Sequence, residues 1–178
     1  MAIDVPKKAE VARAPIDMAP SDALSIQKKA VDTLKGRKIG ILFAEGSDKA
    51  AINKLRRQIE DAEGTPFLVA PKVGGITVKG GTLEADGQLA GSPSILFDAV
   101  ASILTPGAAE ELAAQAVAIQ WFMDAFGHCK TIAHCPGTQV ILDKAGVAKD
   151  AGVVPVEDLL KIGTTRHWAR ESEVRDLA

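Results

Sequence analysis

The fold is decided by the segment Lys38-Ile39-Gly40-Ile41-Leu42-Phe43-Ala44. This nearly continuous apolar run has the length of a strand, and it is typical of a central parallel strand buried on both faces. Gly46-Ser47-Asp48 then supplies a turn and a helix N-cap. The residues after it predict a helix with Ala51, Ile52 and Leu55 on one face. The segment therefore predicts a strand followed by a helix.

The same pattern recurs along the chain. Further strands are predicted at 66–70, 99–104, 131–134 and 152–154, and helices at 105–128, 136–142 and 156–162. The long helical region contains a break near Ala114, and glycine-rich residues 74–91 predict a small hairpin that projects from the sheet. Strands that alternate with helices predict an α/β fold: a flavodoxin-like, doubly wound parallel sheet with helices on both faces.

Composition limits the partners. With 178 residues and 47% hydrophobic content, the chain is long enough to bury one substantial core. The net charge is −2 and the basic residues are scattered, so we expect no nucleic-acid surface. No apolar run approaches the roughly 20 residues that span a bilayer, so we expect no membrane partner. The N-terminus lacks the apolar core of a secretory signal, which favours a cytoplasmic location, and both cysteines are expected to be free thiols.

The chain is predicted to divide near residue 36. Residues 1–22 hold three prolines, several charges and no sustained periodicity. Such a segment buries too little apolar surface to offset its ordering entropy. We therefore expect residues 1–35 to be a partly disordered linker or N-terminal arm, with a short helix over 23–34, and residues 36–178 to be the folded domain with a charged tail at 166–171.

The most suggestive chemical motif is His134-Cys135-Pro136-Gly137, where a predicted strand meets a predicted helix. A cysteine at a strand end that faces a helix N-terminus is where α/β enzymes place a nucleophile. The alternative is that Cys135 is a small, half-buried hydrophobe at a strand end. His134 and Cys135 are adjacent on a strand, so their side chains point to opposite faces and are not expected to pair.

Catalysis by Cys135 would need a separate base. Candidates are Glu45, Asp48 and His128, although Glu45 and Asp48 also suit a turn and a helix N-cap, and His128 suits a helix C-terminus. His128-Cys129 and His134-Cys135 are two adjacent pairs separated by a buried strand. That spacing is unlike a zinc framework, so we expect no metal site.

Several motifs occurring in order resemble the C-terminal domain of large-subunit catalases. The resemblance extends over roughly residues 36–178, and residues 1–35 resemble the linker that joins this domain to the haem-bearing part. The motifs are Gly36–Leu42 (GRKIGIL), Val69–Gly75 (VAPKVGG), Ala85–Val100 (ADGQLAGSPSILFDAV), Asp124–Lys130 (DAFGHCK) and Arg166–Glu171 (RHWARE).

The resemblance implies a flavodoxin-like fold related to the class I glutamine amidotransferase-like superfamily, which includes intracellular cysteine peptidases and deglycases. It also implies a homotetrameric haem enzyme as parent, one that converts hydrogen peroxide to water and oxygen. Because this chain has no tyrosine, it lacks the proximal haem ligand that such catalases use. We therefore expect no cofactor in this chain and haem in the parent catalase.

The related cysteine enzymes place a glutamate in the first helix, against the nucleophile. The matching position here is about Ala51, and Cys135 falls about one residue before the expected nucleophile position, at Pro136. We therefore expect a non-catalytic domain with Cys135, His134 and Glu45 as a vestigial site. Its expected role is to stabilise the parent tetramer and to hold unfolding client proteins.

The client-binding role requires an exposed apolar patch, expected near Ile76 and Val78 or within residues 89–97. The alternative function is a cysteine hydrolase or deglycase that uses Cys135. A third hypothesis is a flavin-binding module, by analogy of fold.

Overall fold

The computed structural model describes residues 10, 12–14 and 16–174, and the chain separates into two units at Val31 and Asp32. In the N-terminal unit the predicted helix over 23–34 is wrong. Only one 3-10 turn, η1 (Asp22–Leu24), forms there, and it buries no residue. A short isolated helix without an apolar face to pack is marginal in water, and within residues 23–34 only Leu34 is buried.

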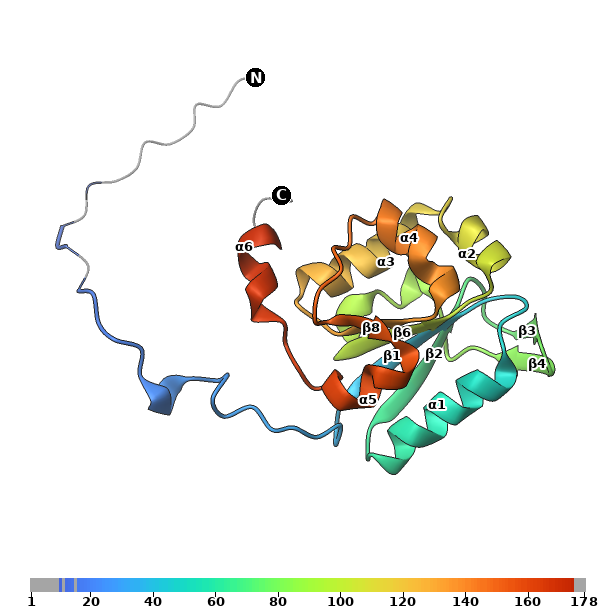
Figure 1. Cartoon of the computed structure of the whole chain (residues 1–178), viewed down its shortest axis with the longest axis horizontal. Coiled ribbons are helices and arrows are strands. Elements are labelled where there is room, and N and C mark those ends of the chain that lie inside the picture. Colours follow the sequence, from blue (N-terminus) through green and yellow to red (C-terminus); the bar gives the residue numbers. More distant parts are fainter. Residues whose placement is uncertain (1–9, 11, 15, 175–178) are drawn as a thin grey trace, which may run out of the picture. The chain divides into compact units, whose positions relative to one another are not determined.

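The second unit is built on a parallel sheet, as the sequence predicts (Figure 1). Its strands are β1 (Lys38–Phe43), β2 (Thr65–Ala70), β5 (Gly87–Gln88), β6 (Ala99–Ile103), β7 (Ile132–His134) and β8 (Val153–Pro155). Their order is β5-β2-β1-β6-β7-β8, and all pairings are parallel. Without the two-residue edge strand β5, this is the flavodoxin-like order.

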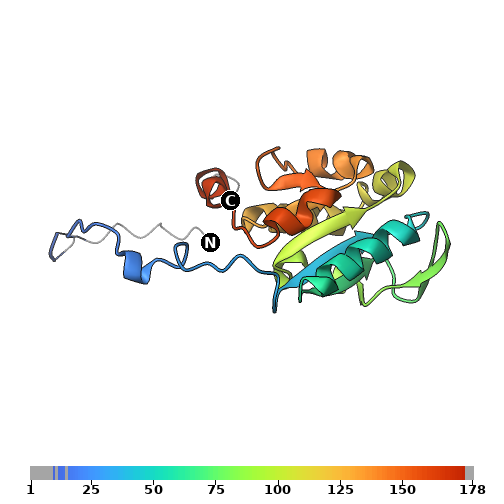
Figure 2. The ribbon, with the colours of Figure 1, turned by 60° about the horizontal axis from the view of Figure 1, so that its bottom comes forward.

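Helices cover both faces of the sheet (Figures 1 and 2). On one face lie α1 (Lys49–Asp61) and α5 (Leu159–Ile162), and on the other lie α2 (Pro106–Leu112), α3 (Ala116–Gly127) and α4 (Gln139–Lys144). Alternation along β1 supplies both cores. Ile41 and Phe43 pack with the α1 side, whereas Leu42 packs with the α3 side. Buried side chains on both faces explain the continuous apolar run of β1.

Gly40 in β1 makes room for an aromatic cluster on the α3 side. A Cβ atom at this position would lie 2.5 Å from the ring of Phe97, so only glycine fits. The Phe97 ring in turn lies 5.5 Å from that of Phe67 and 6.4 Å from that of Trp121, measured between centroids. The first strand and the aromatic cluster are therefore complementary in shape.

The predicted glycine-rich hairpin forms as β3 (Gly75–Val78) and β4 (Gly81–Glu84), which pair antiparallel. The expectation that its apolar side chains are exposed is wrong. Ile76 and Val78 are 2% and 5% exposed and belong to the core on the α1 side. The hairpin is folded back against the domain, because Gly46 donates its main-chain N–H to Thr77 O.

The predicted charged tail is partly buried. Its residues form η6 (Trp168–Arg170) and α6 (Glu171–Val174), and Arg170 is only 2% exposed. The Arg170 guanidinium donates to both carboxylate oxygens of Asp150, at 2.5 and 2.7 Å, and lies 4.4 Å from the centre of the Phe126 ring. A buried guanidinium needs such partners to offset its desolvation, so this ion pair anchors the C-terminal segment.

We predict that Gly40→Ala lowers the free energy of unfolding by about 1–3 kcal/mol, because the added methyl group forces Phe97 out of its packed position. Gly91→Ala is the matched control, since a Cβ atom there meets nothing within 4 Å. It should change stability by less than about 0.5 kcal/mol. Urea unfolding of the three proteins measures the difference, and equal stabilities would contradict the packing described.

Candidate functional site

The candidate site lies at the edge of the sheet where the parallel strands end, and two cavities flank it. The first, which we call the cysteine cavity, has a volume of about 230 Å³ and is lined by Ala51, Lys54, Cys135 and Glu157, among others. The second lies where the strand order reverses, at the topological switch point of the sheet, and we call it the switch cavity. It has a volume of about 410 Å³ and is lined by residues that include Glu45, Lys72 and Glu111. Doubly wound sheets bind ligands at this edge.

The backbone at Cys135 is relaxed. The residue precedes the 3-10 turn η4 (Pro136–Thr138) and has φ −82° and ψ 159°, an extended conformation that any residue adopts. Nucleophiles in α/β hydrolases sit instead on a sharp, strained turn between strand and helix. Cys135 therefore lacks the strained backbone that exposes such a nucleophile.

The Cys135 thiol is occupied by the neighbouring strand end. Sγ accepts a hydrogen bond from Leu104 N at 3.2 Å and donates to Leu104 O at 3.1 Å. Thr138 Oγ1 lies 3.4 Å from Sγ and 3.0 Å from the buried hydroxyl of Ser102. All these partners are neutral, so the thiol connects the ends of β6 and β7 rather than facing a base.

Glu45 and His134 do not join Cys135 in a site. Glu45 lines the switch cavity and is absent from the lining of the cysteine cavity. His134 uses Nδ1 to contact the main-chain carbonyl of Cys135 at 3.1 Å, not its thiol. The three residues that the sequence grouped are thus close along the sheet edge but have separate surroundings.

The other proposed bases have structural roles. Asp48 caps α1 by accepting from Ala50 N at 2.9 Å and from Ala51 N at 3.1 Å, and it pairs with Lys79 at 3.4 Å. The Ala51 amide, and next the Lys79 ammonium, lower the pKa of Asp48. His128 is the C-cap of α3, so the whole of β7 lies between it and Cys135.

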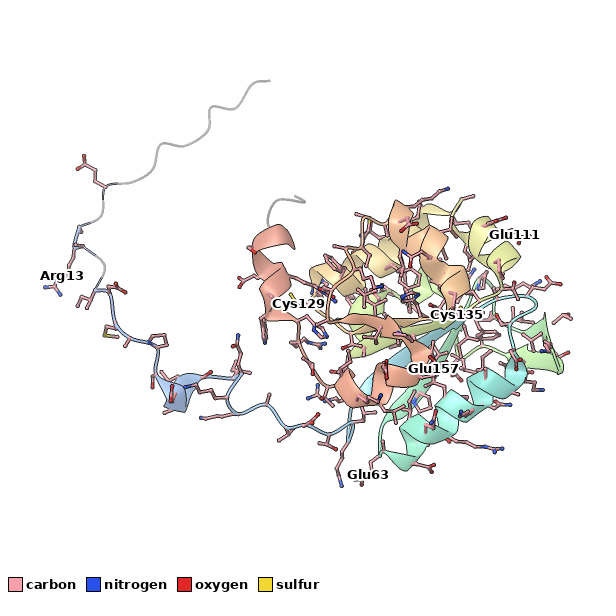
Figure 3. The ribbon with its side chains drawn as sticks, viewed as in Figure 1. Arg13, Glu63, Glu111, Cys129, Cys135 and Glu157 are labelled. Atoms are coloured by element: carbon pink, nitrogen blue, oxygen red, sulfur yellow. The ribbon has the colours of Figure 1, made fainter. Side chains whose placement is uncertain are left out.

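Glu157 is the carboxylate that sequence reasoning missed. It lies in η5 (Val156–Asp158), directly after β8, and lines the cysteine cavity (Figure 3). Its position after a parallel strand was the available signal, since those strand ends share one edge. In the described part of the chain Glu157 makes no hydrogen bond with the thiol, while Ala51 presents only a methyl group to the same cavity.

The structure offers no metal cluster within residues 10, 12–14 and 16–174. No group of three or more histidine, cysteine, aspartate or glutamate side chains there is placed to hold an ion. His128 and Cys129 precede β7, whereas His134 and Cys135 lie at its other end. In the same described residues, no helix is both long and apolar enough to cross a bilayer.

Comparison with known proteins identifies relatives that match nearly the full length of this chain. The model of a family described as the C-terminal domain found in long catalases matches residues 35–167. Catalase C of Rhizobium meliloti (strain 1021) is 37% identical over 96% of this chain and 26% of its own length. Catalase HPII of Pseudomonas putida is 27% identical over 97% of this chain and 25% of its length. The chain thus spans about a quarter of these curated relatives.

A solved structure has the same fold. It is a cysteine-to-alanine mutant of a DJ-1 superfamily protein from Salmonella typhimurium, with a TM-score of 0.62 and 17% sequence identity. The similarity covers 80% of this chain and 96% of that protein. At this identity the likeness establishes the architecture and carries no statement about chemistry.

We predict that Cys135 reacts with iodoacetamide at about pH 6 no faster than free cysteine does, because its sulfur contacts no base or cation among the residues that the structure describes. The reaction can be followed by mass spectrometry of the labelled peptide. Cys135→Ser, which leaves only the buried Cys129, gives the background rate. A rate about tenfold above that of free cysteine would show an activated nucleophile and contradict the prediction.

Proposed function

Because this chain belongs to the family of C-terminal domains found in long catalases, we propose that it is a non-catalytic domain that stabilises the parent enzyme through protein contacts. The observation that carries the proposal is the Cys135 sulfur, whose partners are Leu104 and Thr138 and no acid or base. A thiol in this arrangement lacks what a cysteine hydrolase requires. The geometry therefore disfavours the hydrolase alternative.

The parent is proposed to be a homotetrameric haem enzyme that decomposes hydrogen peroxide. The residues of this chain do not fit haem. It has no tyrosine, and Cys135, whose thiol is already hydrogen-bonded, opens on a cavity of only about 230 Å³. The switch cavity has no histidine, cysteine, methionine or tyrosine in its lining to serve as an axial ligand. We therefore assign the haem to the part of the long catalase outside this chain.

A rigid, exposed apolar pair supports a contact function. Ile95 and Leu96 lie in η3 (Ser94–Leu96) and are 51% and 55% exposed. The segment is held from below, because Phe97 is buried and Lys130 Nζ donates to Ser94 O at 2.8 Å. Apolar side chains fixed in an exposed position are suited to bind a protein surface at low entropic cost.

The same surface is proposed to hold unfolding client proteins. Such clients expose apolar segments, and Ile95 and Leu96 offer a matching surface. This replaces the hairpin as the expected patch, because Ile76 and Val78 are buried.

Removing this domain from a long catalase is predicted to shorten the half-life of the enzyme's peroxide-decomposing activity at elevated temperature by about tenfold. This is the effect of losing roughly 1–2 kcal/mol of contact free energy. The initial rate before heating should not change. The intact enzyme with Val73→Ser, an exposed residue away from η3, serves as control. Equal half-lives with and without the domain would overturn the proposed stabilising role.

The client-binding role is tested by light scattering of a heat-labile enzyme with an equimolar amount of this chain. We expect the chain to suppress aggregation, and the double substitution Ile95→Ser, Leu96→Ser to abolish most of the suppression because it removes the exposed apolar surface. Val73→Ser should suppress as well as the original chain. Absence of suppression by the unaltered chain would refute client binding.

A further inference from the structure

The switch cavity lies where the strand order reverses. The chain passes from β1 to β2 on one side, whereas β6 and β7 extend the sheet on the other. Ala44 and Glu45 line the cavity just after β1, Pro71 and Lys72 just after β2, and Glu111 comes from α2. Reversal points of this kind are the usual ligand sites of open α/β sheets. The volume of about 410 Å³ is in the range of small-molecule pockets.

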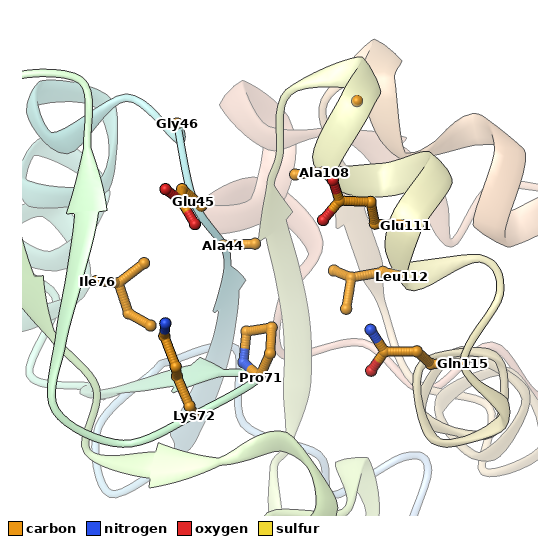
Figure 4. A pocket seen from close by; sticks show the side chains of 11 residues that line it. Ala44, Glu45, Gly46, Pro71, Lys72, Ile76, Ala108, Glu111, Leu112 and Gln115 are labelled. Carbon is orange, nitrogen blue, oxygen red and sulfur yellow. The ribbon is translucent and has the colours of Figure 1, made fainter.

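Charged and polar groups line this cavity from opposite walls, and apolar side chains lie between them on each wall (Figure 4). Figure 4 shows the carboxylates of Glu45 and Glu111 on facing walls, with the Lys72 amine and the Gln115 amide toward the other end of the cavity. Ile76 and Leu112, both buried, are among the apolar lining residues. The cavity therefore combines several charges of both signs with an apolar surface.

The charged side chains that line this cavity make no hydrogen bond or ion pair with other side chains among the described residues. Within the described residues, the exposed side chains of Glu45, Lys72 and Glu111 have no hydrogen-bond or ion-pair partner, in contrast to that of Asp48, which caps a helix and pairs with Lys79. Lys49 is also engaged, because its Nζ donates to Thr82 O at 2.7 Å. The unpaired groups converge on one concave site.

We propose that the switch cavity binds a free basic amino acid. Glu45 and Glu111 hold the two cationic groups of the ligand, and Lys72 holds its carboxylate. Two anionic groups and one cationic group in the cavity complement two cations and one anion in the ligand, while the aliphatic chain of the ligand passes between Ile76 and Leu112 (Figure 4). This binding is independent of the contact function proposed above.

The same charges exclude the flavin hypothesis at this position. A flavin nucleotide carries a phosphate, which two carboxylates repel. The glycine-rich loop that many nucleotide sites use for phosphate is also lacking here, since the loop after β1, Ala44-Glu45-Gly46-Ser47-Asp48, has a single glycine. A cationic ligand is thus favoured over an anionic one.

The test is a titration of the full chain with L-lysine, followed by main-chain amide shifts in NMR spectra. We expect saturable shifts near Glu45, Lys72 and Glu111, with a Kd of about 1–10 mM because each ion pair is exposed to solvent and contributes little. Cadaverine lacks the carboxylate and L-norleucine lacks the second cation. The Kd of each should be at most about fivefold higher than that of L-lysine.

Variants assign the contacts. Glu111→Gln should weaken L-lysine binding about fivefold. Lys72→Met should do the same for L-lysine but leave cadaverine unaffected, since cadaverine has no carboxylate to pair. Glu110→Gln is the matched control, because Glu110 is the exposed neighbour of Glu111 on α2 and does not line the cavity. Its Kd should equal that of the original chain.

Four results would overturn the proposal. They are the absence of saturable L-lysine binding, equal binding of L-norleucine and L-lysine, an equal loss of affinity in Glu110→Gln and Glu111→Gln, and binding of flavin mononucleotide in place of L-lysine.

Discussion

The ends of β6 and β7 are held together by a side chain that substitutes for the main chain. Cys135 N donates to Ser102 O at 3.2 Å, and two residues later, just past the end of β6, the Cys135 thiol bonds both the N–H and the carbonyl of Leu104. Gly137 permits the close approach, because a Cβ atom there would lie 2.9 Å from Leu104 O. Both cavities border the edge that this contact closes.

These hydrogen bonds give Cys135 a structural role in place of the nucleophilic role that its position in the sequence suggested. In a nucleophile site the sulfur is exposed on a strained turn beside a base. Here the backbone at the same position of the fold is unstrained, and the thiol is hydrogen-bonded to Leu104 N and O. The thiol holds the loop after β6 against the segment that begins η4.

Much of the architecture was predictable because it follows from short-range rules. The apolar run of β1 required burial on both faces, and Asp48 suited the N-cap it occupies. The break between α2 and α3 was also anticipated, since Ala114 lies outside both helices. In contrast, β5 is two residues long and leaves no periodic signal.

The missed features depend on partners far away in the sequence. Arg170 is buried only because Asp150 lies beside it, and no local pattern announces such a pair. Glu45 and Cys135 both follow parallel strands, but the turn taken by each loop decides which cavity its residues line. The sequence therefore predicted the edge of the sheet that matters, but not which side chains share a cavity there.

Hydrogen exchange at Leu96 and Phe97 distinguishes a domain that acts by contact from one that does not. Their amides donate to Pro93 O and Ser94 O, both at 3.1 Å, beneath the exposed Ile95–Leu96 surface. If that surface packs on the rest of a long catalase, both amides should exchange about tenfold more slowly in the assembled enzyme than in the isolated chain. Identical exchange rates in the two forms would contradict a contact function for this surface.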